Sequence, residues 1–436
     1  MCAEPAHASV DDPAARHSVA RSLLAPHSAH APSRSLVMAH PPHPYVLSGR
    51  GQWTRVATPV TDAQMRASFL SMVKCGGQVI HVSGRGSDSA DGSSGAPLRQ
   101  ISAAIARALP GDLILVRDGT YGYTEVRDFH GRDDAWLGIM SESASTAARI
   151  HVPGVTDNFV NIIGSDHVGI YGFEVFGDQH NANTNGSGIS IYGNSHHVAV
   201  WNNHIHDFPG GGVNCFDVDG SHDLLDISYN RIHGTSRYSP SNTSGISICA
   251  SRDLTRGGAF PDGYGYRVVG NFIYDVQCLV PFTPGGFHVV TDGNGVSLDQ
   301  VTTAYGYRKP ILVAGNVVAG CGGRGVLAYE SSNVRMIDNT AVGNLKTRSP
   351  AIDGGVELES KSARSVIIER NIICPLHTAD STDHNSSYFD NIILGGTQDV
   401  PAGNHDRRRV GLSYFSGIPN ASALAALPPL AAFWPR

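Results

Sequence analysis

The sequence predicts an all-β solenoid, a right-handed parallel β-helix with an N-terminal capping helix. Three observations carry this prediction: a short motif that begins with glycine recurs along the chain, a second motif that ends in asparagine follows each copy, and the composition favours turns. Of the 436 residues, 50 are glycine and only 16% are charged, which is typical of many short strands joined by tight turns. Strands too narrow to bury their own apolar face become stable by stacking on one another.

The first motif is a glycine followed by a branched apolar residue, any residue and a second apolar residue. Its copies begin at Gly188, Gly212, Gly245, Gly295, Gly325 and Gly355. The last three begin at a constant interval, and loop insertions between coils explain the uneven spacing of the first three. A β-propeller, the alternative, would need repeats of about forty residues with hairpin turns, and the sequence shows no regularly spaced hairpin turns.

The second motif is an alternating apolar run that ends in an asparagine. These asparagines are Asn203, Asn230, Asn271, Asn316, Asn339 and Asn371. An amide side chain that recurs at one structural position can bond its neighbours in adjacent coils. We therefore expect a buried ladder of asparagines with a structural role.

The chain divides into four segments in order. Residues 1–45 are rich in Ala, Pro, His, Ser and Arg, and we interpret them as a disordered leader without the apolar stretch of a secretory signal. Residues 46–75 precede the solenoid, and residues 76–395 form it. An amphipathic helix from about Pro97 to Ala108 is expected to cap its open apolar end. Residues 396–436 are expected to form a C-terminal tail or cap.

Charge and hydropathy exclude several classes of function. The net charge is −6 and the pI is near 6.4, which leaves no basic face for nucleic acid. No stretch approaches about 18 uninterrupted apolar residues, so we expect no membrane span. The seven cysteines contain no C-x-x-C pair, which argues against structural zinc. We expect a monomer.

Strand alternation indicates which side chains face outward. If the apolar residues after each glycine point inward, the residues two and four positions after the glycine line the outer face. Stacked coils then form two columns. The first is Ser190, Asn214, Ser247, Ser297, Leu327 and Glu357, and the second is Tyr192, Phe216, Cys249, Asp299, Tyr329 and Glu359.

A polar face with interspersed aromatic rings suits a sugar chain, because rings stack on aromatic side chains and hydroxyl groups bond to amides and carboxylates. We expect the substrate-binding residues to be Tyr192, Asn214, Phe216, Tyr329 and Glu330. An ordinary solvated sheet surface is the alternative for any single residue of this face.

Carboxylates concentrate in the last three coils, at Asp292, Asp299, Glu330, Glu357 and Glu359, with Arg324 and Lys361 nearby. In a β-elimination on a uronate, a cation neutralises the substrate carboxylate and a lysine or arginine of lowered pKa removes the C5 proton. Acids on adjacent coils, about 5 Å apart, can supply oxygens to calcium. This region is therefore where we expect the chemistry, with Asp299 and Arg324 taking part.

The segments PGDLILVRDGTY, DGNGVSLD and GGRGVLAYESSNVRMIDNTA resemble the pectate-lyase-like right-handed β-helix superfamily over roughly residues 76–395. The run GGVELESKS resembles the strand of the alginate lyase and chondroitinase B family that carries two calcium-binding glutamates and a catalytic lysine, although that family places its lysine farther from the glutamates. The resemblance implies Glu357 and Glu359 as calcium ligands and Lys361 as catalytic. It also implies a lyase acting on an acidic polysaccharide, outside the cell or in the periplasm.

Two other functions stay open. A glycoside hydrolase would use two carboxylates, such as Asp292 with Asp299 or Asp217 with Asp219. A non-catalytic glycan-binding or surface protein would use the solenoid only as a scaffold.

A set of histidines and aspartates has H-x-H and D-x-D spacings that permit metal binding. It comprises His204, His206, Asp207, Asp217, Asp219, His222 and Asp223. His206 and His233 follow successive Asn-x-Ile motifs at equivalent places, which favours a structural role for them.

Overall fold

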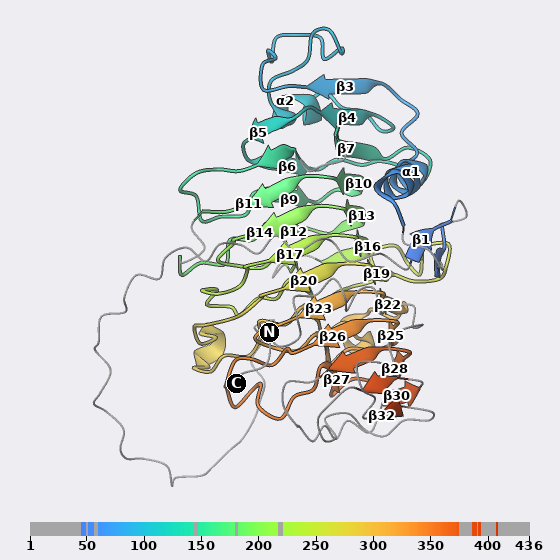
Figure 1. Ribbon diagram of the computed structural model, residues 1–436. Helices are drawn as coiled ribbons and strands as arrows, with labels where there is room; N and C mark the ends of the chain where they lie inside the picture. Colours follow the sequence, from blue (N-terminus) through green and yellow to red (C-terminus); the bar gives the residue numbers. More distant parts are fainter. Residues whose placement is uncertain are drawn as a thin grey trace.

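Most strands of the chain stack in parallel into three long sheets, and each coil in the middle of the stack contributes one strand to each sheet (Figure 1). The structure, a computed structural model, describes residues 45–48, 51–55, 60–143, 147–178, 182–216, 221–374, 386–389, 391–393 and 407–408. The predicted right-handed parallel β-helix is confirmed. The predicted leader lies almost wholly outside the described residues, as does most of the predicted tail.

We call the three parallel sheets sheet 1, sheet 2 and sheet 3, in the order in which a coil enters them. Sheet 1 contains β3 (Val79–Val82), β4 (Leu113–Val116), β7 (Leu137–Ser141), β10 (Asp166–Tyr171), β13 (Ser195–Trp201), β16 (His222–Ser228), β19 (Tyr266–Val269), β22 (Ile311–Ala314), β25 (Val334–Ile337), β28 (Val366–Glu369) and β30 (Ser386–Phe389). Sheet 2 contains β5 (Gly119–Tyr121), β8 (Ala148–Ile150), β11 (Glu174–Phe176), β14 (His204–His206), β17 (Arg231–His233), β20 (Phe272–Tyr274), β23 (Val317–Ala319), β26 (Thr340–Val342), β29 (Ile372–Cys374), β31 (Ile392–Ile393) and β32 (Arg407–Arg408). Sheet 3 contains β6 (Thr124–Arg127), β9 (Val160–Ile163), β12 (Ile189–Tyr192), β15 (Val213–Cys215), β18 (Ile246–Cys249), β21 (Val296–Asp299), β24 (Val326–Tyr329) and β27 (Leu358–Lys361).

The core is a column of branched apolar side chains inside the solenoid. The residue after each motif glycine points inward and has no exposed surface in five successive coils: Ile189, Val213, Ile246, Val296 and Val326. A strand of three or four residues buries only one or two side chains, so each coil depends on the coils above and below it.

The predicted asparagine ladder is confirmed. From Asn230 onward, each Oδ1 accepts hydrogen bonds from the backbone N–H and the Nδ2 of the asparagine one coil earlier, at 2.8–3.1 Å. Asn391 adds a further rung after Asn371. Because the ladder lies at the turn from sheet 1 to sheet 2, it satisfies buried turn groups and holds adjacent coils in register.

The capping helix α2 (Ile101–Ile105) lies at the predicted end of the solenoid and is shorter than the predicted span. It buries Ile101 and Ala104 in the apolar core, and Figure 1 shows it beside β3 at the top of the solenoid. Among the described residues, no helix combines the length and the hydrophobicity that crossing a bilayer requires.

A second helix, α1 (Asp62–Val73), was not anticipated by the sequence analysis. Its buried residues Met65, Phe69 and Val73 pack in one apolar cluster with aromatic side chains of sheet 1. The helix begins with a capping box between Thr61 and Gln64, a signal that the sequence contains. The short antiparallel pair β1 (Tyr45–Leu47) and β2 (Trp53–Arg55) covers the same side of sheet 1.

Candidate functional site

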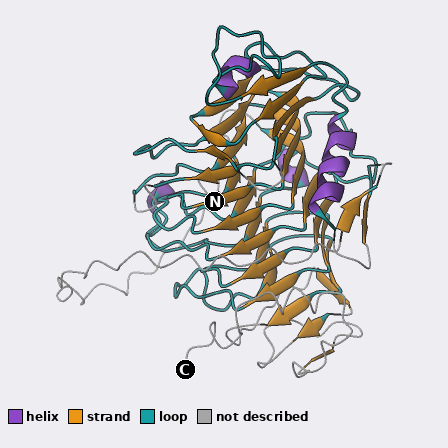
Figure 2. Cartoon of the chain, turned by 45° about the horizontal axis from the view of Figure 1, so that its top comes forward, coloured by secondary structure: helices purple, strands orange, loops and turns teal. Residues whose placement is uncertain are grey.

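Loops that lead from sheet 2 into sheet 3 extend over the outer face of sheet 3 in the middle coils. They precede β12, β18 and β21, and the last of them contains the short helix η1 (Pro284–Gly286), drawn in yellow in Figure 1. Figure 2 shows these long teal loops projecting from one side of the solenoid. The first two are tied together, since Asn185 Nδ2 donates to Ser241 Oγ at 2.9 Å and Ser239 Oγ donates to Asn185 Oδ1 at 2.7 Å.

A cleft of about 190 Å³ lies between these loops and strands β15, β18 and β21. We call it the sheet-3 cleft. Most of its lining residues are serine, threonine or asparagine, and one side chain, Phe216, provides an aromatic ring. The cleft is lined by Asn185, Asn214, Phe216, Ser241, Asn242, Thr243, Ser244, Ser247, Ile248, Cys249, Pro284, Asp292, Ser297 and Asp299.

Asp292 enters the cleft from the loop before β21. One of its oxygens accepts a hydrogen bond from Thr291 Oγ1 at 2.7 Å, and the other accepts one from Asn294 Nδ2 at 2.8 Å. Asn294 is fully buried, and its Oδ1 in turn accepts from the backbone N–H of Arg324 at 2.8 Å. The carboxylate of Asp292 is therefore held in one orientation from both sides.

Asp299 is the last residue of β21 and points to the outer face, as the strand alternation predicts. Its side chain is largely buried, with 6% of the residue exposed. Burial raises the pKa of this carboxyl group above its ordinary value, and the neighbouring charges of Asp292 and Glu330 add to that rise. The cleft thus contains two carboxyl groups in different environments.

The predicted alignment of the last copy of the glycine motif, which begins at Gly355, is wrong by two residues. Val296 N–H donates to the carbonyl of Gly325, and in the next coil Val326 N–H donates to the carbonyl of Glu357, both at 3.0 Å. Glu357, and not Gly355, therefore occupies the place of the motif glycine. The strand register puts Glu359 beside Leu327 and Lys361 beside Tyr329.

The shift explains what the two predicted calcium ligands do. The side chain of Glu357 is fully buried and accepts hydrogen bonds from Asn344 N at 2.9 Å and Asn344 Nδ2 at 2.5 Å. Glu359 forms a buried ion pair with Arg324, with Nε 2.6 Å from Oε2. Because one carboxylate faces the interior and the other is neutralised by a guanidinium, the pair does not fit a calcium ion that needs several converging oxygens.

The remaining predicted residues are spread along the face of sheet 3. Asn214 and Phe216 line the cleft, and Tyr192 lies one coil before them. Lys361 is exposed at the end of β27. It lies next to the half-buried Tyr329, and burial raises the pKa of that phenol to about 12. Gln300 Nε2 lies 3.5 Å from Glu330 Oε2. Asp217 and Asp219 fall outside the described residues, and the catalytic and binding roles of all these residues stay predictions.

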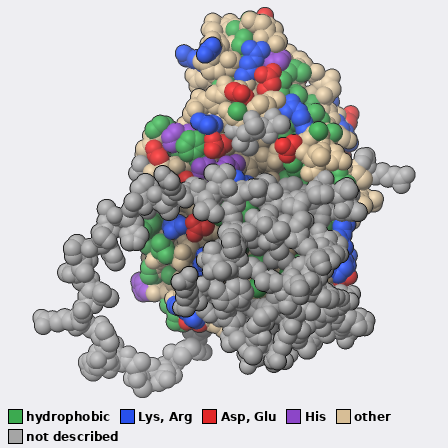
Figure 3. Space-filling view, in the orientation of Figure 1, with side chains coloured by type: hydrophobic (Ala, Val, Ile, Leu, Met, Phe, Trp, Pro, Cys, Tyr) green, Lys and Arg blue, Asp and Glu red, His purple; other side chains and the backbone are tan. Residues whose placement is uncertain are grey.

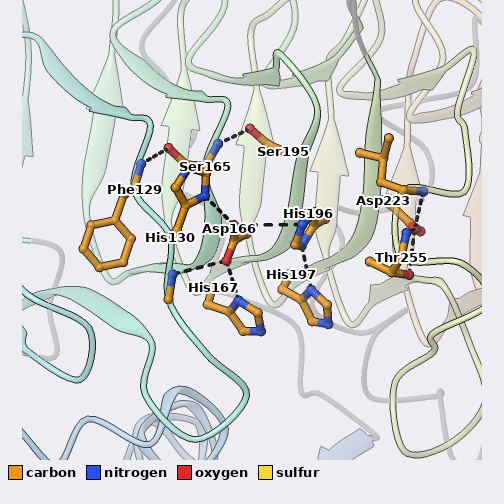
Figure 4. Close-up of polar contacts among 12 residues, drawn as sticks. Phe129, His130, Ser165, Asp166, His167, Ser195, His196, His197, Asp223 and Thr255 are labelled. Carbon is orange, nitrogen blue, oxygen red and sulfur yellow. Dashed lines mark hydrogen bonds and ion pairs between the residues drawn. The ribbon is translucent and has the colours of Figure 1, made fainter.

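A group of histidines at the start of β10 and β13 escaped the sequence analysis (Figure 4). Asp166 lies between the Nδ1 atoms of His130 and His167, each 2.7 Å away, and His196 Nδ1 lies 2.8 Å from His197 Nδ1. Burial opposes the ionisation of Asp166, but the hydrogen bonds to His167 and His130 prevail and lower its pKa to about 2. The only sequence signals were an Asp-His and a His-His pair before two alternating strands.

The histidines of sheet 2 behave as their repeat positions predict. His206 and His233 are directly opposite each other in β14 and β17, and their rings stack with centroids 4.9 Å apart. Stacking continues to Phe176 on one side and Tyr274 on the other. Equivalent positions in the repeat therefore place these rings in one continuous stack along sheet 2.

Comparison with known proteins supports the fold. No protein-family model matches the chain, and no curated protein matches it in sequence. Among solved structures, XylC in complex with xylose is 12% identical, with 76% of this chain and 70% of that chain covered and a TM-score of 0.51. The pectate lyase Pel9A is 16% identical, with 76% and 74% covered and a TM-score of 0.43. The alginate lyase from Paenibacillus sp. str. FPU-7 is 14% identical, with 76% and 99% covered and a TM-score of 0.43.

The likeness to XylC bears on architecture: the match extends over most of both chains, but an identity this low does not show a shared reaction. The resemblance to pectate-lyase-like β-helix proteins is confirmed at the level of the fold. The reaction has to be argued from the sheet-3 cleft.

Proposed function

We propose that this protein is a carbohydrate-active enzyme that hydrolyses glycosidic bonds in the sheet-3 cleft. Asp299 is the general acid, and Asp292 is the nucleophile or the base. One observation carries the proposal: two carboxyl groups line a single cleft, and their surroundings differ. A carboxyl pair whose environments separate an acid from a base is the arrangement on which glycosidases depend.

The lining of the cleft supports a sugar as the ligand. Serine hydroxyls and asparagine amides supply donors and acceptors for sugar hydroxyl groups, and Phe216 offers a ring face for the apolar side of a pyranose. XylC, a solved structure of similar fold, is a complex with xylose. A neutral sugar fits the cleft best, because the only acidic or basic side chains in its lining are the two aspartates, which would repel an anionic sugar.

The different catalytic roles of the two aspartates follow from their different environments. Asp299, with its raised pKa, retains a proton for the leaving glycosidic oxygen at a pH where an exposed aspartate has lost it. Asp292 has both oxygens anchored by hydrogen bonds and is oriented either to attack the anomeric carbon or to activate water. A separation of about 5 to 5.5 Å between the carboxyl groups gives retention of configuration, and about 6.5 to 9.5 Å gives inversion.

A lyase remains the competing proposal, with Lys361 as its base. Two contacts favour hydrolysis over it. The guanidinium of Arg324 is committed to Glu359, and the two glutamates expected to hold calcium bind Asn344 and Arg324. The lyase residues therefore do not converge on one substrate position, whereas the two aspartates line the same cleft.

The test is to incubate the full-length protein with a panel of neutral and acidic oligosaccharides. We expect new reducing ends without the ultraviolet absorption of an unsaturated product. Asp299→Asn and Asp292→Asn should each lower kcat/KM by about 10²- to 10⁴-fold, whereas Asp134→Asn, an exposed aspartate outside the cleft, should leave it unchanged. In the wild type kcat/KM should fall as pH rises through the pKa of Asp299, and Asp299→Asn should lack this limb.

Unsaturated products, with activity lost in Lys361→Ala, would select the lyase. Reducing ends that persist in both aspartate variants would overturn the assignment of the two residues. Binding of oligosaccharides without any turnover would identify a glycan-binding protein.

A further inference from the structure

A compact group of metal-ligating side chains lies on the outer face of sheet 2, away from the sheet-3 cleft. It consists of Glu174 on β11 and His204 and His206 on β14, and one ligand atom from each lies within 4.8 Å of the others. Strand alternation brings them together, because residues i and i+2 of β14 share one face and β11 is the neighbouring strand. Figure 3 shows histidine and acidic side chains gathered on this side of the molecule, at the level of β11 and β14 in Figure 1.

The distances within the group suit a shared ion. Glu174 Oε1 lies 3.4 Å from His206 Nε2 and 3.8 Å from His204 Nδ1. Two ligand atoms that each lie about 2.1 Å from one tetrahedral ion are separated by about 3.4 Å. The planes of the two imidazoles are tilted by 33°, so the in-plane lone pairs of both rings can converge on a point between them.

The opposite atom of each ligand is held by a second residue. Asp207 Oδ2 lies 2.8 Å from His206 Nδ1, His233 Nε2 lies 2.9 Å from His204 Nε2, and Arg149 Nε lies 2.8 Å from Glu174 Oε2. Such outer contacts select the tautomer of a ligating histidine and present its other nitrogen to the ion. Each of the three ligands is therefore held in orientation by a contact on the side away from the ion, and only a quarter or less of each side chain is exposed.

We propose that Glu174, His204 and His206 bind a divalent metal ion of the zinc type, preferably zinc itself, with water completing the coordination. Two imidazoles and one carboxylate suit zinc and its neighbours, whereas calcium and magnesium prefer oxygen ligands alone. The ion would join two successive coils from outside. Since its ligands are not part of the sheet-3 cleft, the proposal does not depend on the proposed function.

A second histidine group, His167 with His196 and His197 on sheet 1, is the competing site. It is less suited to one ion, because the rings of His167 and His197 are stacked 4.2 Å apart and within 11° of parallel. Lone pairs that lie in parallel planes do not converge. His167 also has a carboxylate at each nitrogen, Asp166 at 2.7 Å (Figure 4) and Asp133 at 3.0 Å.

The experiment uses the full-length protein after chelation, titrated with Co²⁺ and followed by its visible absorption, then with Zn²⁺ in competition. We expect one equivalent to bind. The side chain of Asp207 is about half exposed. Asp207→Asn should weaken metal binding about 10- to 100-fold, and Glu174→Gln should weaken it further. His196→Asn, in the competing group, should leave it unchanged.

Far-ultraviolet circular dichroism of the metal-free variants separates lost binding from lost folding. The proposal is overturned if the wild type binds neither ion. It is equally overturned if binding survives Asp207→Asn and Glu174→Gln unchanged, or if it is lost in His196→Asn.

Discussion

Replacing one asparagine of the ladder should destabilise the protein strongly, because the substitution disrupts a defined set of buried hydrogen bonds. Asn316 lies in the middle of the ladder. Its Oδ1 accepts from the backbone N–H and the Nδ2 of Asn271, both at 2.9 Å. Its Nδ2 donates to Val268 O at 2.8 Å and to Asn339 Oδ1 at 2.9 Å. Asn316→Ala removes all four bonds without exposing the turn to water.

The magnitude follows from what remains of each partner. The backbone N–H of Asn271 loses its acceptor in a buried turn, which costs about 1 to 3 kcal/mol. Asn271 Nδ2 keeps a bond to Ile227 O, and Asn339 Oδ1 keeps the backbone N–H of residue 316. A lost bond whose partners stay satisfied costs about 0.5 to 1.5 kcal/mol. We therefore expect the free energy of unfolding to fall by about 4 kcal/mol.

Urea unfolding followed by circular dichroism and by tryptophan fluorescence measures this loss. Asn183→Ala, which changes an exposed asparagine in a loop, is the matched control and should cost less than about 0.5 kcal/mol. If Asn316→Ala costs no more than this control, the ladder does not stabilise the solenoid and the reasoning fails.

Three further substitutions test other parts of the structure. Glu359→Ala leaves the guanidinium of Arg324 buried without its carboxylate and should cost about 3 to 5 kcal/mol in urea unfolding; a loss below about 1 kcal/mol would contradict a buried ion pair. The pKa of Asp166 is about 2 in the folded protein and 3.8 ordinarily, so its ionised carboxylate stabilises the fold above pH 4 and this stabilisation is lost as the pH falls toward 2. The free energy of unfolding of Asp166→Asn should therefore fall by about 2 kcal/mol less over this pH range than that of the wild type. An equal fall in both proteins would refute this prediction. Gly295→Ala would put a Cβ 2.2 Å from a core methyl group and should cost about 1 to 3 kcal/mol, whereas Gly122→Ala has open space and should behave as wild type in thermal unfolding.

The repeat was readable from the sequence because two residue types recur at positions with narrow structural requirements. The motif glycine packs so closely on the next coil that a Cβ at Gly245 would lie 2.8 Å from the carbonyl of Gly295. The asparagine supplies both an acceptor and a donor to its neighbours. Positions with such narrow requirements recur visibly, and they place the strands of sheet 3 from β12 to β24 as predicted.

The last copy of the glycine motif shows where a prediction from the repeat pattern fails. A glycine two residues before the true position, Gly355, begins a run that imitates the motif, while Glu357 stands where the glycine belongs. The solenoid accepts this glutamate because both its oxygens find hydrogen-bond donors on Asn344 inside the coil. A buried, satisfied carboxylate is a local solution that periodicity cannot reveal.

The columns of outward-facing residues contain the part of the sheet-3 cleft that lies on the strands, but they could not predict its walls, which come from loops of different coils. Asp299 belongs to a column, but Asp292 lies in a loop, and Asn185 reaches the cleft from a loop three coils earlier. These loops leave the solenoid at the same corner, between sheet 2 and sheet 3, so the parallel register stacks them over one face. The rigid coils thus set where the loops begin, and the loop contacts set where the carboxylates point. A chain with the same repeats and shorter loops would keep the fold and lose the cleft, which is why the fold alone does not carry the reaction.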